Sequence, residues 1–230
     1  MAVLSIVIPA YNEERFIGTL LHQIKAVDLS RFDLTKEIIV VDDCSKDRTA
    51  AIVEAEPGVV LLRQPKNGGK GQAVRAGIAR ATGEYLIIQD ADLEYDPEDY
   101  IPMLDALFSG KGTVVYGSRY MQSGKHADQS LLAYLGGRSL SLIALAFTRT
   151  WLTDTVTAYK LFRRAELAAL PLETSGFELD HEITSRMVAR GARIVEVPIR
   201  YAPRSKAEGK KIGLKDWFIG FRTFWRYRRG

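Results

Sequence analysis

Residues 37–47 read EIIVVDDCSKD and residues 84–92 read EYLIIQDAD, and these two stretches decide the fold. Each is a short, apolar and largely β-branched run that ends in acidic residues, as buried strands followed by polar loops do. Similar apolar runs occur at 4–8 and 59–62, and helical patterns lie between the four. This alternation predicts β-α-β units and therefore an α/β domain with a mostly parallel sheet.

The remaining elements follow from periodicity and from helix-start signals. Seven helices are expected, at 13–26, 47–55, 71–81, 96–107, 131–147, 178–190 and 214–227. Asn12 is expected to cap the first helix, and Pro97 lies near the start of the fourth. Further strands are expected at 113–116, 155–162 and 193–197, and a polar loop at 121–126.

Composition excludes several classes of protein. The 230 residues are 47% hydrophobic and 26% charged, which is typical of one large globular domain. The single cysteine, Cys44, permits no internal disulfide, and three scattered histidines give no zinc-binding spacing. The run SLSLIALAFT at 139–148 has half of the ~20 residues that a spanning helix needs. The first residues carry no basic signal region, so we expect a cytoplasmic location.

Positive charge is concentrated near the end of the chain. Residues 200–230 hold ten Lys or Arg and two Asp or Glu, a net charge of +8, which leaves −4 for residues 1–199. One helical stripe there contains Leu214, Trp217, Phe218, Phe221, Phe224 and Trp225. An aromatic stripe flanked by arginines is typical of a helix at a membrane interface, and a helix docked on the protein core is the alternative. No nucleic-acid motif accompanies the basic segment, so nucleic acid is not expected as a partner.

Acidic residues follow two strand ends, where open α/β sheets bind ligands. Asp90 and Asp92 point to the same side of an extended chain, and Glu94 can join them from the next turn. Such oxygen ligands suit Mg²⁺ or Mn²⁺ bound to a substrate diphosphate. For Asp43, the position alone leaves open whether it binds a ligand or caps the following turn.

The glycine-rich stretch NGGKGQAVRAG, residues 67–77, matches neither the P-loop nor the dinucleotide-binding pattern. Its glycines still permit close backbone approach at a helix start, where N–H groups favour anions. Lys70 can reach a diphosphate from this position, and a tight turn with a solvated lysine is the alternative.

With these residues in view, the sequence resembles the family 2 glycosyltransferases of GT-A fold, in particular the branch that includes dolichyl-phosphate mannose and glucose synthases. The motifs occur in family order, up to about Lys211: SIVIPAYNEE, EIIVVDDCSKDRT, NGGKGQAVRAG, GEYLIIQDADLEYDPED, VVYGSRY, TDTVTAYKLFRR and RIVEVPIRYAPRSKAEGKK. The resemblance implies a Rossmann-like, mostly parallel sheet flanked by helices over residues 1–211, followed by an amphipathic helix at 212–230. The sequence departs from the family at Cys44, where glycine is usual, and it lacks the transmembrane helices of many members.

The resemblance also implies roles on the donor side of the site. The nucleoside pocket would be formed by Pro9, Tyr11, Glu13 and Asp43. The DxD motif, which holds the metal and the donor diphosphate, would be Asp90, Ala91 and Asp92. Glu94 would be a third metal ligand, at a position that is often Gln in mannosyl members, and Lys70 would assist at the diphosphate.

On the acceptor side, the resemblance implies a phosphate clamp of Arg119, Arg138 and Arg204. Arginine suits this role because its planar fork binds phosphate through two hydrogen bonds. Asp154 would orient the sugar or stabilise positive charge that develops on it, and capping a turn is the alternative. A phosphate monoester has a second pKa of about 6, so it needs positioning more than deprotonation.

The implied reaction is inverting hexosyl transfer from a nucleotide sugar to a polyprenyl phosphate such as dolichyl or undecaprenyl phosphate, with Mg²⁺ or Mn²⁺. GDP-mannose, UDP-glucose and UDP-N-acetylglucosamine all fit as donors. The expected location is peripheral, at the cytoplasmic face of a membrane, with a membrane-protein partner as a further expectation. One alternative is a family 2 enzyme with a carbohydrate hydroxyl acceptor and Asp180 or Glu182 as base. Another is a non-catalytic nucleotide-sugar-binding protein at the membrane.

Overall fold

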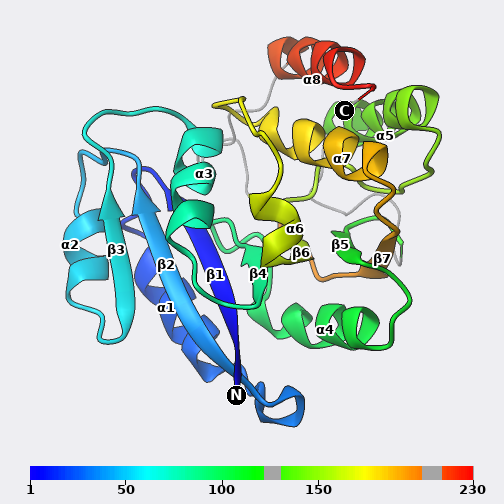
Figure 1. The fold of residues 1–230 in the computed structure, drawn as a ribbon. Coiled ribbons are helices and arrows are strands. Elements are labelled where there is room, and N and C mark those ends of the chain that lie inside the picture. Colours follow the sequence, from blue (N-terminus) through cyan, green and yellow to red (C-terminus); the bar gives the residue numbers. More distant parts are fainter. Residues whose placement is uncertain (122–130, 204–213, 230) are drawn as a thin grey trace.

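The structure is a computed structural model that describes residues 1–121, 131–203 and 214–229. A seven-stranded sheet in the order β3-β2-β1-β4-β6-β5-β7 carries helices on both faces (Figure 1). The strands are β1 (Ala2–Ala10), β2 (Leu34–Asp42), β3 (Val59–Arg63), β4 (Tyr85–Ile88), β5 (Val114–Ser118), β6 (Lys160–Arg163) and β7 (Ile194–Pro198). Only β6 runs antiparallel to its neighbours, so the predicted mostly parallel α/β sheet is confirmed.

The helices in the described part of the chain are α1 (Ile17–Ala26), α2 (Thr49–Glu54), α3 (Lys70–Arg80), α4 (Tyr100–Phe108), α5 (Leu131–Thr148), α6 (Arg164–Ala168), α7 (Leu179–Ala189) and α8 (Leu214–Arg226). Two short 3₁₀ turns, Ser30–Phe32 and Pro97–Asp99, precede β2 and α4. Helix α6 was not predicted from the sequence. The predicted loop at 121–126 lies outside the described residues except for Met121.

The centre of the sheet is fully buried because helices cover both faces of β1. Ile6 and Ile8 belong to a core cluster with residues of α1 and α4, whereas Val7 belongs to a cluster with residues of α3 and α7. Strands buried on both faces are nearly continuous hydrophobic runs, which is why these segments were readable from the sequence. β1 pairs in parallel with β2 and β4, so the three strands deliver their following loops to the same edge.

The start of α1 differs from the prediction. Asn12 has a φ of 57°, in the left-handed region, and the helix begins only at Ile17. The side chain of Asn12 accepts a hydrogen bond from the Lys46 N–H at 2.8 Å, and its own N–H donates to Ser45 Oγ at 2.9 Å. The predicted helix cap is therefore wrong, because Asn12 binds the neighbouring loop instead.

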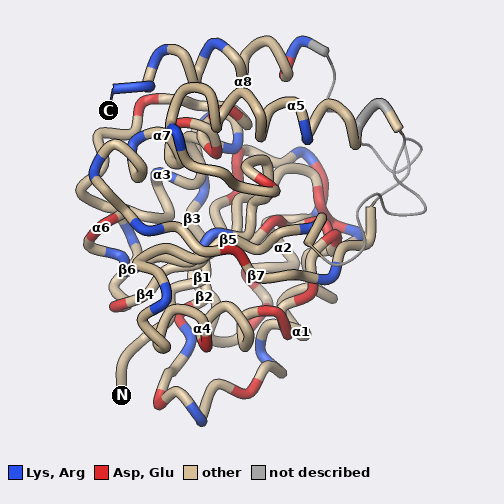
Figure 2. The backbone as a smooth tube through the Cα atoms, turned by 90° about the vertical axis from the view of Figure 1, so that its right-hand side faces the viewer, with Lys and Arg blue, Asp and Glu red and all other residues tan. Residues whose placement is uncertain are grey.

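Helices α5 and α8 lie side by side at one end of the molecule, and both contact α7 (Figures 1 and 2). Phe224 is buried against the ring of His181, with 4.8 Å between the ring centroids. Burial lowers the pKa of His181 to about 4, so this contact is made by a neutral imidazole. Phe218 and Trp225, in contrast, are 64% and 52% exposed.

The aromatic stripe predicted for the last helix is thus divided between two environments. Phe224 faces the protein, so the prediction that it shares a membrane-facing stripe is wrong, whereas Phe218, Phe221 and Trp225 remain exposed. Within the described ranges, no helix is both long and apolar enough to cross a bilayer.

Gly77 marks the closest approach of α3 to the sheet. A Cβ at this position would lie 2.3 Å from Cγ1 of Val7 and 3.3 Å from Cγ2 of Val41. We expect Gly77→Ala to lower the free energy of unfolding by about 1–3 kcal/mol, because overpacking outweighs the better helix propensity of alanine. Urea denaturation measures this. Gly136→Ala in α5 is the control, since no atom lies within 4 Å of its added Cβ. Equal effects of the two changes would contradict the packing argument.

Candidate active site

The loops after β1 and β2 are bound to each other by side-chain-to-backbone hydrogen bonds. The N–H of Glu13 donates to Thr49 Oγ1 at 2.8 Å, and the N–H of Glu14 donates to Asp47 Oδ2 at 3.1 Å. Pro9, Tyr11 and Glu13 are half-buried at this edge of the sheet. The structure thus places the three predicted nucleoside-binding residues beside the loop that follows β2.

Asp43 connects that edge to the glycine-rich stretch. Its two carboxylate oxygens accept hydrogen bonds from the N–H groups of Gly68 and Gly69, each at 2.8 Å, and Asn67 Nδ2 donates to its carbonyl at 3.2 Å. Asp43 therefore stabilises the turn before α3 and not the turn directly after β2.

Asp42, which was not singled out from the sequence, lines a cavity of about 320 Å³. The other residues that line this cavity are Cys44, Ser45, Asp47, Ala50, Ala51, Arg63 and Gln64.

The N-terminus of α3 is packed beneath residues 173–177. A Cβ on Gly71 would lie 2.7 Å from the carbonyl carbon of Ser175, so only glycine permits this approach. Glu182 of α7 fixes the overlying segment by accepting from the N–H and hydroxyl of Thr174 at 2.9 and 2.6 Å. It also accepts from Arg186 Nε at 2.8 Å. Glu182 therefore acts as a structural residue of the site.

Four charged side chains form an alternating row across the site. Lys70 Nζ lies 2.7 Å from Asp90 Oδ1 and 3.5 Å from Asp180 Oδ2, and Lys160 Nζ lies 2.7 Å from Asp180 Oδ1. Burial opposes the charge of Asp180, but the two lysines hold the pKa of Asp180 below its ordinary value. Likewise, Asp90 and Asp180 outweigh burial and raise the pKa of Lys70 above its ordinary value. The sequence alone did not indicate that Lys160 belongs here.

The DxD segment follows β4 and turns sharply at Leu93, whose φ is 60°. The N–H of Glu94 donates to Asp92 Oδ1 at 3.1 Å, and the hydroxyl of Tyr201 donates to Glu94 Oε2 at 3.1 Å. Ala91 is buried between the two half-buried aspartates. In the part of the chain that the structure describes, no three Asp, Glu, His or Cys side chains are grouped as a complete metal site.

Asp90 and Asp92 nevertheless fit a hard divalent cation. Both are partly accessible carboxylates. Mg²⁺ typically uses one or two carboxylates and fills its other positions with water and substrate phosphate oxygens. Glu94 as a third protein ligand stays a prediction.

Arg119 and Asp154 form a two-point ion pair. Arg119 Nε and one terminal nitrogen donate to Oδ2 and Oδ1 of Asp154 at 2.6 and 2.7 Å, and the Arg119 N–H adds a bond to Oδ2 at 3.1 Å. Asp154 is 0% exposed. Separate roles were predicted for these two residues, for Arg119 on the acceptor phosphate and for Asp154 on the sugar, and in the structure they are paired.

Arg138 of α5 lies near the same aromatic ring as Arg119. Its guanidinium carbon lies 5.9 Å from the centroid of the Tyr120 ring, and that of Arg119 lies 5.4 Å from it. Arg138 also donates to the Thr153 carbonyl at 2.8 Å and lies 5.5 Å from the Trp151 ring. Two of the three predicted phosphate-binding arginines are therefore brought together, while Arg204 lies outside the described residues.

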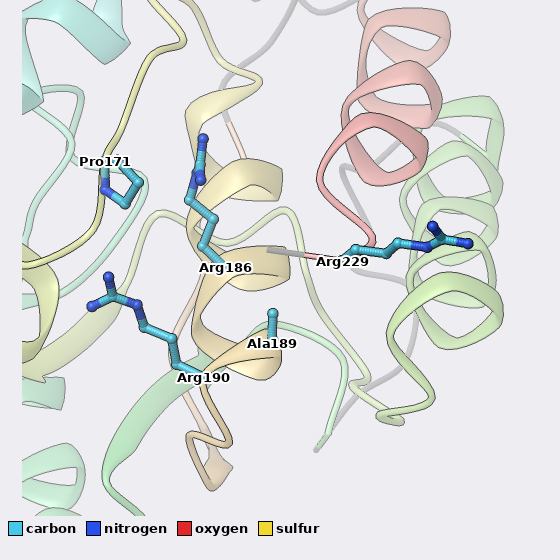
Figure 3. A pocket seen from close by; sticks show the side chains of 5 residues that line it. All are labelled: Pro171, Arg186, Ala189, Arg190 and Arg229. Carbon is cyan, nitrogen blue, oxygen red and sulfur yellow. The ribbon is translucent and has the colours of Figure 1, made fainter.

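A further cavity of about 340 Å³ lies apart from the strand-end cluster, beside α7 and the segment that follows α8 (Figure 3). It is lined by Pro171, Arg186, Ala189, Arg190 and Arg229. Arg186 is already paired with Glu182 and Glu173, and Figure 3 shows Arg229 pointing away from the other labelled side chains. None of the residues predicted for the active site lines this cavity.

The sequence model of glycosyl transferase family 2 matches residues 5–168. The chain belongs to this family. It is 31% identical over 215 residues to a dolichol-phosphate mannosyltransferase of Pyrococcus furiosus, covering 91% of this chain and 59% of the relative. It is 33% identical over 224 residues to a dolichyl-phosphate beta-glucosyltransferase of Trichomonas vaginalis, covering 90% and 66%. The chain thus spans less than two thirds of either relative.

Solved structures of glycosyltransferases of GT-A fold resemble this one. Glucosyl-3-phosphoglycerate synthase from Mycobacterium tuberculosis in complex with UDP aligns with a TM-score of 0.74 at 22% identity, covering 99% of this chain and 80% of that one. The same enzyme with Mn²⁺, UDP and phosphoglyceric acid aligns with a TM-score of 0.73 at 20% identity, covering 99% and 78%. At these identities the likeness shows the fold, and it confirms the predicted GT-A fold.

The ion pair of Arg119 and Asp154 has a measurable signature. We expect Arg119→Met to lower the free energy of unfolding by about 3–5 kcal/mol, because it leaves the buried carboxylate without its partner. The double change Arg119→Met with Asp154→Asn should lower the free energy of unfolding by less than Arg119→Met alone. Chemical denaturation of the unchanged protein, the single variant and the double variant measures these free energies.

Arg31→Met is the matched control, because Arg31 pairs with Asp105 on the surface, where a pair is worth about 1 kcal/mol or less. A double variant that is no more stable than Arg119→Met would contradict the assignment of Arg119 as the counter-ion of Asp154.

Proposed function

We propose that this family 2 protein is an inverting hexosyltransferase that moves a sugar from a nucleotide-sugar donor to a polyprenyl phosphate, with Mg²⁺ or Mn²⁺. The observation that carries the proposal is the grouping of Arg119 and Arg138 around Tyr120, next to the DxD turn. Tyr201 links the DxD turn to these arginines, because its hydroxyl donates to Glu94 and its ring lies 5.2 Å from the Arg119 guanidinium carbon. The names of the two relatives described above support the same acceptor class.

On the donor side, Asp90 and Asp92 would hold the divalent cation. The bound cation would supply a Lewis acid that offsets the negative charge of the departing nucleoside diphosphate. Lys70 adds a positive charge at the N-terminus of α3, where backbone N–H groups also favour anions. Pro9, Tyr11 and Glu13 would receive the nucleoside, with Asp43 holding the glycine-rich turn beside it.

On the acceptor side, a dianionic phosphate requires no base to become a nucleophile. The two carboxylates that could serve as a base for a hydroxyl acceptor are both occupied. Asp180 is paired with two lysines that keep its pKa low, and Glu182 is buried and accepts several hydrogen bonds. A weakly basic carboxylate is a poor general base, so these contacts favour a phosphate acceptor over a carbohydrate hydroxyl.

The phosphate would be bound by Arg138 together with Arg204, and Arg119 would contribute from its pair with Asp154. In-line attack by a phosphate oxygen on the anomeric carbon would invert the configuration. The identity of the sugar and base depends on a few loop contacts, so both a mannosyl and a glucosyl donor are candidates.

We also propose that the protein binds the cytoplasmic face of a membrane through α5 and α8. Exposed apolar side chains project from both helices: Leu135, Leu142, Phe218, Phe221 and Trp225. Lys and Arg positions recur along α8 and just after it (Figure 2). An apolar face with basic neighbours is typical of helices at anionic membrane surfaces. A membrane-protein partner at this surface is part of the same proposal.

The transfer reaction itself is the decisive test. Purified protein should transfer sugar from one member of a panel of labelled nucleotide sugars to polyprenyl phosphate, and chelation of divalent cations should stop the transfer. Asp92→Asn should reduce the rate by about 10²-fold or more while leaving the thermal unfolding curve unchanged, because a carboxylate of the donor site is lost. Glu98→Gln, at an exposed position nearby, is the control.

Three outcomes would contradict this function. A transfer rate of Asp92→Asn near that of the unchanged protein would remove Asp92 from the donor site. Product formed with a carbohydrate hydroxyl and none with polyprenyl phosphate would favour the hydroxyl-acceptor alternative. Nucleotide-sugar binding without turnover on any acceptor would favour the non-catalytic alternative.

Membrane binding is tested separately by co-sedimentation with vesicles that contain anionic lipid. The double change Phe218→Ser with Trp225→Ser should weaken vesicle binding by about tenfold or more, because two exposed aromatic side chains are lost. Phe108→Ser, at a 41% exposed position on α4, is the control and should bind as the unchanged protein does. Equal binding of the double variant and the control would exclude α8 as the membrane-binding surface.

A further inference from the structure

Lys70 lies between two carboxylates that come from different parts of the chain. Asp90 follows β4, Asp180 belongs to α7, and the ammonium is within ion-pair distance of both. The contact with Asp90 is the shorter, at 2.7 Å against 3.5 Å. The ring of Phe177 also lies near the ammonium, with 5.7 Å between the ammonium nitrogen and the ring centroid. Lys70 therefore has two possible acidic partners.

The position of Asp180 is fixed. Lys160 is 0% exposed, and its ammonium donates to Asp180 Oδ1 and to the carbonyl of Thr157. The ring of Tyr116 lies 5.0 Å from the same ammonium. Burial lowers the pKa of Lys160 and the carboxylate of Asp180 opposes that effect. Asp180 is thus a buried carboxylate with a defined orientation, and its second oxygen faces Lys70.

The position of Asp90 is open. The Asp90 side chain is 23% exposed, whereas that of Lys70 is 13% exposed. Asp90 is also half of the pair proposed above to hold a divalent cation. A cation bound to Asp90 repels an ammonium 2.7 Å from the same carboxylate, because like charges at short range are costly where solvent is scarce. Lys70 and the cation therefore compete for the negative charge of Asp90.

We propose that Lys70 exchanges between these two carboxylates: it binds Asp90 when no divalent cation is present and moves to Asp180 when a cation binds Asp90. This inference rests on the proposed function, because it takes Asp90 and Asp92 as the cation site. Asp180 is then a positioning residue, which retains the ammonium beside the donor diphosphate after Asp90 is taken. Lys160 keeps Asp180 ionised and oriented for that role.

The proposal predicts opposite effects for two neighbouring charges. Lys70→Met removes the competitor for Asp90, so it should tighten the binding of Mn²⁺ alone by about tenfold. Asp180→Asn removes the alternative partner, so Lys70 stays on Asp90 and Mn²⁺ binding should weaken by a similar factor. With methionine at position 70, Asp180→Asn should have no further effect, since it acts through Lys70. Electron paramagnetic resonance of free Mn²⁺ measures each affinity without nucleotide or turnover.

A second change serves as the control for any loss of stability in Asp180→Asn. Asp180→Asn leaves Lys160 buried without its counter-ion, which is destabilising. The double change Asp180→Asn with Lys160→Met removes the buried pair together and should weaken Mn²⁺ binding as Asp180→Asn does. Lys66→Met is the control for loss of a lysine before α3, because Lys66 is exposed, and it should leave Mn²⁺ affinity unchanged.

The outcomes separate this inference from the function on which it rests. Mn²⁺ binding that is lost in Asp92→Asn, tightened in Lys70→Met and weakened in both Asp180 variants supports the exchange. If Asp92→Asn abolishes Mn²⁺ binding but Lys70→Met and the Asp180 variants bind as the unchanged protein does, the exchange is overturned and the cation site remains. If Asp92→Asn binds Mn²⁺ as tightly as the unchanged protein, the proposed metal-dependent function fails as well.

Discussion

Parallel pairing of β1 with β2 and β4 is the constraint on which the site depends. Parallel strands in register end at one edge of the sheet, so the loops after Ala10, Asp42 and Ile88 leave side by side. Residues that are far apart in the sequence, such as those of the loops after β1 and β4, therefore lie at the same edge of the sheet. The register is itself fixed by burial on both faces, since a slip by one residue would exchange Ile6 and Val7 between two packed cores.

The edge alone would not define a site, because loops do not hold their shape without partners for their backbone groups. Here the partners are carboxylates. Asp43 binds two N–H groups of the glycine-rich turn, Glu182 binds those of residues 173 and 174, and Glu196 binds those of Thr153 and Asp154. Acidic residues thus shape the loops at this edge of the sheet, and Asp92, which accepts a hydrogen bond from the N–H of Glu94, is also one of them.

Much of the fold was predictable because it depends on local patterns. Buried strands such as β1 and β4 are continuous apolar runs, and the acids that end them are visible in the sequence. The pairing of Arg119 with Asp154, or of Lys160 with Asp180, was not predictable, because each joins segments whose approach is set by the packing of β5, β6 and α7. The same reason explains Asn12, whose side chain has a better partner in a distant loop than in its own helix.

The two arginines beside Tyr120 differ in what they can offer an anion. Arg119 is held at both ends of its fork by a buried carboxylate, so most of its charge is already balanced. Among the described residues, the contacts of Arg138 are with a neutral carbonyl and with aromatic rings, which leave its positive charge for a ligand. It lies on α5, the helix that also exposes Leu135 and Leu142. A cation whose described partners are neutral, next to an exposed apolar surface, matches a phosphate carried on a hydrocarbon chain better than a sugar hydroxyl, which is neutral and water-soluble. This arrangement of charge therefore supports the acceptor class proposed above.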